Sequence, residues 1–169
     1  MIFYHGSNTE IKTIDLSERR PFKDFGRGFY LTDIEEQAKR MAVRTTKRYG
    51  GSPVVTIFEL NEEIYADNSI KIKQFENPDK EWALFVMNNR NRSFKDIEST
   101  LTNYDNKYDV VIGAVANDDL AVTFNLFSQG YIDIESMIKR LEFKELTMQY
   151  SFHTEQSIKY LKTAGVINV

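Results

Sequence analysis

The chain contains no cysteine and only two histidines, His5 and His153, among its 169 residues. The lack of cysteine excludes disulfide scaffolds, zinc ribbons, iron–sulfur clusters and thiol nucleophiles. Two histidines are also too few to favour a metal site. We therefore expect no bound metal, and chemistry that depends on histidine, hydroxyl or carboxylate groups.

Long hydrophobic runs and charge of one sign are also missing. No apolar run approaches the ~18 residues that a membrane span needs, and the first residues, MIFYHGSN, lack the pattern of a secretory signal. The formal net charge of −3 disfavours non-specific binding to a phosphate backbone. Three prolines and eight glycines leave little material for a linker. These features predict a cytoplasmic protein with one domain, residues 1–169, and no membrane partner.

Strand and helix patterns alternate along the whole chain. Runs rich in β-branched and aromatic residues predict strands at Ile2–His5, Gly28–Leu31, Val54–Leu60, Ile70–Gln74, Val110–Ile112 and Met148–His153. Helical spacing predicts helices from Asp33 to about Tyr49, over Asp79–Asn89, from Asp133 to Leu141, and from Thr154 through Leu161. Asp33 and Glu36 are expected to cap the first helix, and Thr154 the last. This mixed order predicts an α+β fold.

Two short segments near the N-terminus place polar side chains beside glycines. In Tyr4-His5-Gly6-Ser7 a histidine ends a strand, and the glycine lets another group approach the backbone. In the segment DFGRGFYLTD, residues 24–33, Gly26 and Gly28 precede an aromatic strand that carries Tyr30 to a fixed place. Taken alone, each segment is also typical of a strand next to a turn.

A third segment, QYSFHTE at residues 149–155, combines an apolar face with a polar one. Side chains alternate along a strand, so Tyr150 and Phe152 share one face while Gln149, Ser151 and His153 share the other. Burying the three polar groups without partners would cost about 1–3 kcal/mol each. They are therefore expected to face solvent or to line a polar cleft, and both alternatives stay open.

In this order the three segments resemble the ADP-ribosyltransferase superfamily, on the His-type branch that includes the poly(ADP-ribose) polymerases and diphtheria toxin. The chain looks closer still to an uncharacterised bacterial family of that clan, over essentially its whole length. The resemblance implies an ADP-ribosyltransferase-like split β-sheet, with peripheral helices around a cleft that holds NAD in a bent conformation.

The resemblance also implies roles for single residues. His5 is expected to orient the nicotinamide ribose, and Gly6 and Ser7 to anchor the carboxamide. Tyr30 is expected to stack on the electron-poor nicotinamide ring, and Gln149 stands where many relatives carry the catalytic glutamate. Further candidates for contact with NAD, including its pyrophosphate, are Arg27, Gly28, Thr32, Arg44 and Arg48.

The chain departs from the family pattern at several of these positions. The amide of Gln149 stabilises positive charge on the ribose less well than a carboxylate and cannot act as a base, which argues against chain elongation. A count without gaps from Tyr30 places Ala38 where polymerase relatives have a serine, and Met41 where they have a second stacking tyrosine. Glu155 offers a carboxylate nearby, but its position favours a role in the first turn of a helix.

The resemblance implies an NAD-dependent mono-ADP-ribosyltransferase that modifies a macromolecule and releases nicotinamide. The alternatives are a non-catalytic module that binds NAD or ADP-ribose, and an NAD glycohydrolase. A protein target is favoured over duplex nucleic acid, and an RNA target stays open. The resemblance also implies a role as a toxin or host-directed effector. A Gln149→Glu variant is the natural test of the third segment.

Overall fold

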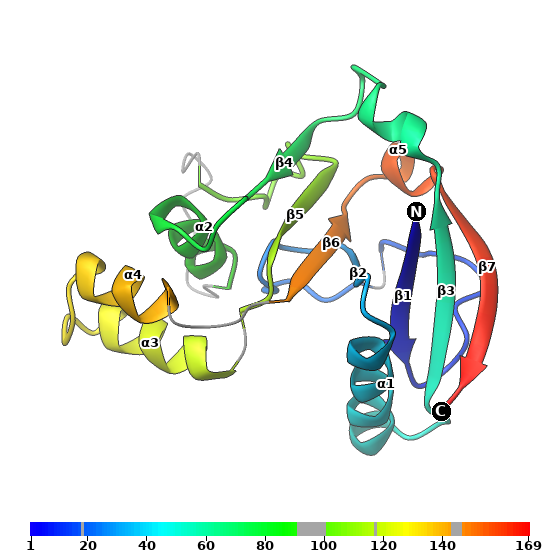
Figure 1. Ribbon diagram of the computed structural model, residues 1–169, viewed down its shortest axis with the longest axis horizontal. Coiled ribbons are helices and arrows are strands. Elements are labelled where there is room, and N and C mark those ends of the chain that lie inside the picture. The colour runs from blue at the N-terminus through cyan, green and yellow to red at the C-terminus, as the bar shows by residue number, and fades with distance from the viewer. Residues whose placement is uncertain (18, 91–100, 117, 143–146) are drawn as a thin grey trace.

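The computed structural model describes residues 1–169 except 18, 91–100, 117 and 143–146. Within this part of the chain, helices pack against two β-sheets (Figure 1). The strands are β1 (Ile2–Ser7), β2 (Phe29–Leu31), β3 (Val54–Leu60), β4 (Ile72–Gln74), β5 (Val110–Ala114), β6 (Met148–Phe152) and β7 (Leu161–Asn168). The helices are α1 (Glu35–Tyr49), the 3-10 helix η1 (Glu62–Tyr65), α2 (Lys80–Arg90), α3 (Asp118–Ser128), α4 (Ile134–Glu142) and α5 (Glu155–Ile158).

The two sheets meet at a single bridge between β1 and the end of β2. One sheet has the order β1-β3-β7 and is antiparallel; the other has the order β2-β6-β5-β4, in which only the β4–β5 pair is parallel. Tyr4 and Thr32 exchange two backbone hydrogen bonds, of 2.8 and 3.1 Å, across the junction. Beyond this bridge β1 has no neighbouring strand on that side among the described residues. The predicted α+β class is confirmed.

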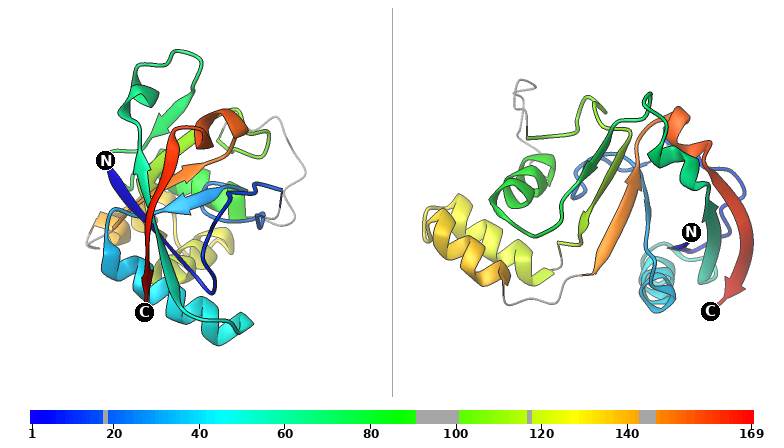
Figure 2. Two further views of the ribbon diagram at one scale, coloured as in Figure 1. Left: turned by 90° about the vertical axis from the view of Figure 1, so that its right-hand side faces the viewer. Right: turned by 45° about the horizontal axis from the view of Figure 1, so that its top comes forward.

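Apolar side chains fill the space between the sheets and the space behind the larger one. Phe3 and Phe58 from the smaller sheet pack with Phe29 and Phe152 from the larger sheet. The opposite face of β5 packs against α2, α3 and α4, where Trp82 is fully buried. Helix α1 lies against β1 and β3, and α3 and α4 lie at the far end of the molecule (Figures 1 and 2). The two layers hold the ends of β1, β2 and β6 in fixed relation.

Most of the predicted elements are present, with boundaries shifted by a few residues. All six predicted strands occur, and the first three expected helices correspond to α1, α2 and α4. The expected cap of α1 is wrong: its N-cap is Ile34, whose backbone N–H is bound by the Thr32 hydroxyl at 3.1 Å. The capping hydroxyl therefore belongs to Thr32, one residue before the predicted Asp33. The backbone of Thr32 pairs with Tyr4, so the extended segment ends at Thr32.

The predicted last helix is too long. Thr154 does cap α5 through a capping box with Ser157, but this helix contains only Glu155–Ile158. The chain then forms β7, which pairs with β3 over Leu161–Asn168. This strand was not predicted because it is an edge strand with mostly exposed side chains, so it lacks the apolar alternation that marks a strand in a sequence.

Candidate functional site

A pocket of about 550 Å³ opens where β1 and β2 diverge. Eight of the predicted site residues line it. They are His5, Gly6, Ser7, Tyr30, Thr32, Arg44, Arg48 and Gln149. Further residues of helix α1 and the basic residues of the segment 19–23 also belong to the wall. The structure thus brings the three sequence segments together around one cavity.

His5 presents a hydrogen-bond acceptor to this pocket. Its Nδ1 lies 2.8 Å from the carbonyl oxygen of Tyr30, so Nδ1 carries the proton and donates it. The ring stacks on Phe29 with centroids 4.5 Å apart. Burial lowers the pKa of His5 to about 4, although the hydrogen bond to Tyr30 acts in the opposite direction. At neutral pH the ring is therefore uncharged, and Nε2 can accept a hydrogen bond from a hydroxyl group.

Gly6 brings bare backbone to the pocket wall. The peptide groups of residues two apart in a strand point to the same side, so those of Gly6 point where Tyr4 meets Thr32. Since β1 has no partner strand on that side beyond the bridge, the Gly6 N–H and C=O face the cavity. A donor and an acceptor on one backbone unit match a primary carboxamide. Ser7 follows in the same wall.

Tyr30 is a rigid wall residue whose hydroxyl is already in use. Its hydroxyl donates to the carbonyl of Gly26 at 2.7 Å and accepts from the N–H of Phe25 at 3.0 Å. Burial raises the pKa of Tyr30 well above its ordinary value. The Lys23 ammonium lies 4.6 Å from the centre of the Tyr30 ring. Tyr30 therefore offers the pocket an aromatic surface that Lys23 shares, and no free acid or base.

Thr32 lines the pocket but spends its hydroxyl inside the protein. The hydroxyl donates to Gln37 Oε1 at 2.6 Å, in addition to binding the N–H of Ile34. Gln37 Nε2 in turn donates to the Thr147 hydroxyl at 3.0 Å. Thr32 thus fixes the start of α1 and ties it to the chain before β6.

Arg27 and Gly28 do not line the pocket. The Arg27 side chain is exposed, and its carbonyl oxygen accepts a hydrogen bond from His153 Nδ1 at 2.8 Å. Gly28 lies against the same ring, where an added Cβ would come within 2.8 Å of His153 Cε1. These two residues therefore shape the turn before β2. His153 is buried, and its Nε2 lies 2.8 Å from the Ser151 hydroxyl, so it holds this turn from the side opposite the pocket.

Cationic side chains dominate the rim of the pocket. The basic residues in its wall are Arg19, Arg20, Lys23, Arg44 and Arg48, and no aspartate or glutamate belongs to the wall in the part of the chain that the structure describes. Burial, and next the charge of Arg19, lower the pKa of Lys23 to about 8. This rim contrasts with the net charge of −3 for the whole chain. The pocket is therefore suited to an anionic ligand.

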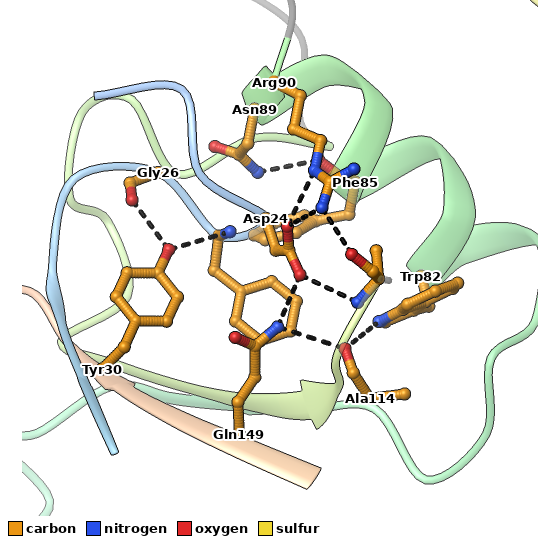
Figure 3. A network of polar contacts seen from close by, with 11 residues as sticks. Asp24, Gly26, Tyr30, Trp82, Phe85, Asn89, Arg90, Ala114 and Gln149 are labelled. Carbon is orange, nitrogen blue, oxygen red and sulfur yellow. Dashed lines mark hydrogen bonds and ion pairs between the residues drawn. The ribbon is translucent and has the colours of Figure 1, made fainter. Parts of the chain in front are cut away.

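The polar face of β6 is buried and hydrogen-bonded. Ser151 contacts the carbonyl of Val111 at 3.0 Å, and Gln149 is 8% exposed at the pocket floor. The amide nitrogen of Gln149 donates to Asp24 Oδ2 at 2.7 Å and to the Ala114 carbonyl at 3.2 Å (Figure 3). The expectation of a polar cleft is thus confirmed for Gln149, whereas a solvent-facing strand is wrong.

Two residues behind Gln149 were missed by the sequence reasoning. Asp24 is 7% exposed, and its Oδ1 lies 2.7 Å from Arg90 Nε and 2.6 Å from Arg90 Nη2. Its Oδ2 also accepts from the N–H of Ala116 at 2.9 Å. Asp24 starts the second segment and Arg90 ends α2, so no local spacing relates them. Only the tertiary fold shows that they support the pocket floor.

A family model described as "Protein of unknown function (DUF3990)" matches residues 1–163. The chain belongs to the DUF3990 family. No match was found among curated proteins or among solved structures. The match covers the whole pocket wall of this DUF3990 chain, from Tyr4 to Gln149.

The described part of the DUF3990 chain has neither clustered metal ligands nor a membrane-spanning helix. Over the described residues, no group of three or more histidine, cysteine, aspartate or glutamate side chains is placed to hold a metal ion. In the same part of the chain, no helix has the length and apolar character that crossing a membrane requires. The site of the DUF3990 chain combines a neutral imidazole, an amide and a cationic rim.

The two histidines predict how the stability of the DUF3990 chain depends on pH. Burial lowers the pKa of both His5 and His153 to about 4. The unfolded chain binds these protons near pH 6.5, so the free energy of unfolding should fall as the pH drops from 6.5 toward 4, by up to about 1.4 kcal/mol per pH unit for each histidine. Urea unfolding between pH 7 and 5 measures this slope, above the range in which most carboxylates titrate.

A His153→Gln variant provides the control for this slope. It removes one of the two titrating groups, so the slope between pH 6.5 and 5 should be about half that of the parent chain, whatever the absolute stability of the variant. An unchanged slope would mean that His153 does not resist protonation in the folded chain.

Proposed function

We propose that this DUF3990 protein is an NAD-dependent mono-ADP-ribosyltransferase that modifies a macromolecular target and releases nicotinamide, with an ADP-ribosyltransferase-like arrangement of its two sheets. The observation that carries the proposal is the pocket itself. It gathers His5, Gly6, Tyr30 and Gln149 around one cavity, and these are the residues that the resemblance relates to NAD.

Two positions found only by counting along the chain add support. Ala38 and Met41, which a gapless count from Tyr30 matches to the family's carboxamide-binding serine and second stacking tyrosine, both line the pocket. Met41 is 48% exposed, so it offers a flexible apolar surface at the mouth of the cavity. In this proposal Met41 closes the nicotinamide subsite, and the Gly6 backbone holds the carboxamide without help from residue 38.

The polar groups of the pocket match two parts of NAD, its pyrophosphate and its ribose. The pyrophosphate carries negative charge, which the arginines of α1, Arg44 and Arg48, and the segment 19–23 would neutralise. The ribose hydroxyls are hydrogen-bond donors, and the uncharged His5 offers Nε2 as an acceptor. A neutral pocket floor below a cationic rim therefore fits a sugar that is linked to phosphates.

The proposed reaction uses the bond between ribose and nicotinamide, which the positive charge of the nicotinamide ring already activates. The bond between C1′ of the ribose and the nicotinamide nitrogen breaks, and nicotinamide leaves as a neutral molecule with the electron pair. A nucleophilic group of the target then bonds to C1′ and loses its proton to solvent or to a base on the target. His5, Gly6 and Tyr30 hold the sugar and the ring in place, and most of the catalytic effect comes from this orientation.

The composition of the wall favours one second candidate. No carboxylate lines the pocket in the described residues, and Gln149 occupies its floor. A carboxylate near the ribose would stabilise the positive charge that develops at C1′. Its absence from the wall is the specific observation in favour of a module that binds NAD or ADP-ribose without turnover.

A labelled-NAD experiment tests the proposal. We expect the protein, incubated with NAD carrying label in its adenylate phosphate and with cell lysate, to transfer the label to a macromolecule. Free labelled ADP-ribose would instead indicate an NAD glycohydrolase. Intact NAD that binds measurably by calorimetry would indicate the binding module. If NAD neither binds nor reacts, the proposal is wrong.

A charge-reversal pair checks that this pocket binds the nucleotide. The Arg44→Glu variant should weaken NAD binding by about tenfold or more, because a cation near the pyrophosphate becomes an anion. The Lys162→Glu variant makes the same charge change on the exposed outer strand β7, outside the pocket wall, and should leave the affinity nearly unchanged. Equal losses in both variants would indicate a general charge effect.

A further inference from the structure

The orientation of the Gln149 amide is fixed by its neighbours. Its nitrogen lies within hydrogen-bond distance of Asp24 Oδ2 and the Ala114 carbonyl, and both of these groups are acceptors. An amide oxygen in this place would face two other oxygens, so the atom must be the donating nitrogen. Figure 3 shows the nitrogen turned toward Asp24 and Ala114 and the oxygen turned away from them.

The Asp24 carboxylate has no acceptor position left for a ligand. Within the described part of the chain its four contacts come from Arg90 Nε, Arg90 Nη2, the N–H of Ala116 and the Gln149 amide, all of them donors. Asp24 is buried and is not part of the pocket wall. Its carboxylate is therefore fully occupied and does not reach a ligand directly.

The free end of the amide faces the cavity. Gln149 Oε1 makes no hydrogen bond within the described part of the chain. The Thr46 hydroxyl is the one side-chain polar atom there that is both sealed from solvent and without a partner, so the Gln149 oxygen is open to solvent. Since Gln149 lines the pocket, this oxygen is an acceptor at its floor.

We propose that Asp24 is a positioning residue that locks Gln149 so that residue 149 offers only a hydrogen-bond acceptor to the ligand, and that the ligand must place a hydroxyl donor there. The identity of this ligand as NAD rests on the proposed function, whereas the lock does not. With His5 Nε2 in the same wall, the pocket then offers two uncharged acceptors, a pattern that selects a polyhydroxylated sugar.

The lock also explains why a glutamine stands at this position. A carboxylate at residue 149 would lie beside Asp24 and the Ala114 carbonyl, so three acceptors would meet without a hydrogen. An amide at residue 24 opposite a carboxylate at residue 149 would not remove this conflict. The N–H of Ala116 requires an acceptor at the position of Asp24 Oδ2, so an amide nitrogen cannot stand there. The new carboxyl group should therefore hold a proton to pH values well above its ordinary range. A Gln149→Glu variant is thus not expected to gain a catalytic carboxylate at neutral pH.

The pH dependence of Gln149→Glu tests the lock. Relative to the parent chain at the same pH, its Tm should fall by about 5 °C or more between pH 5 and pH 8, as the shared proton is lost. Gln74→Glu is the matched control, because Gln74 also donates to a carboxylate, that of Glu76 at 2.8 Å, but is exposed. Its Tm difference from the parent should change little over this range. Equal pH dependence in both variants would overturn the proposal.

A double-mutant cycle tests whether Asp24 acts through Gln149. Asp24→Asn should weaken NAD binding by about fivefold, and Gln149→Met by a similar factor, in line with the loss of one hydrogen bond. In the Gln149→Met background, Asp24→Asn should cause no further loss. Additive losses would show that Asp24 does not act through residue 149. If NAD does not bind the parent chain, the proposed function fails, while the pH experiment still decides the lock.

Discussion

A Gly6→Ala variant should lose about 4 kcal/mol of the free energy of unfolding, more than the usual cost of overpacking, because the added Cβ meets backbone atoms that cannot move alone. An added Cβ would lie 1.9 Å from the carbonyl oxygen of Ala38 and 2.8 Å from the backbone nitrogen of Ala42. Both atoms belong to the backbone of α1, so no side chain can rotate to relieve the contact. The helix would have to move away from β1. Urea unfolding measures the loss.

The same shift of α1 would also disturb the pocket. Ala38, Met41, Arg44 and Arg48 line the cavity from this helix, so a displaced α1 changes both the nicotinamide side and the cationic rim. Even a folded population of Gly6→Ala should therefore bind NAD poorly if the proposed function holds.

Gly165→Ala is the matched control on the same sheet. Gly165 lies in β7, and the nearest atom to an added Cβ is Ile57 Cδ1 at 3.5 Å, an ordinary contact. This variant should stay within about 1 kcal/mol of the parent chain, because alanine fits there and also reduces the freedom of the unfolded chain. If Gly6→Ala proves as stable as Gly165→Ala, the close approach of α1 to β1 is not a property of the protein.

Gly6 illustrates how far a sequence can predict a site. The sequence indicated that some group approaches the backbone here, and the structure shows that α1 does so on the Cβ side while the peptide edge faces the pocket. The sequence could single out His5, Tyr30 and Gln149, which all line the pocket, for the same reason, since each lies in a short segment with a local pattern. Elements with clear apolar periodicity were predicted in the same way, whereas the exposed strand β7 was not.

Long-range polar contacts leave no such pattern. Asp24 and Arg90 are 66 positions apart, and Gln149 is 125 positions from Asp24. Nothing in the spacing of these residues relates them, because they meet only when β6, α2 and the loop before β2 have packed. The lysine and arginines of segment 19–23 were missed for the same reason. A single sequence can suggest what a residue does in its own segment, but not which distant residues form hydrogen bonds or ion pairs with it.

Removing the ion pair between Arg90 and Asp24 should destabilise the protein. Arg90→Met should lower the free energy of unfolding by about 3 kcal/mol, toward the lower end of the values for broken buried ion pairs because the Arg90 side chain is 31% exposed. The variant loses both contacts to Asp24 Oδ1 and the hydrogen bond from Arg90 Nη2 to the Ala116 carbonyl at 2.6 Å. It leaves the buried Asp24 charge without its cation. Urea unfolding at neutral pH measures the change.

An exposed ion pair that involves the same helix provides the comparison. Lys73 and Glu81 are 2.6 Å apart, but the Glu81 side chain is 49% exposed, so Lys73→Met should cost less than about 1 kcal/mol. Adding Asp24→Asn to Arg90→Met should recover part of the loss, since the unpaired charge disappears. A cost for Arg90→Met no larger than that for Lys73→Met would show that Asp24 does not depend on Arg90. Recovery by Asp24→Asn instead identifies the buried charge, rather than lost packing of the Arg90 side chain, as the main source of the cost.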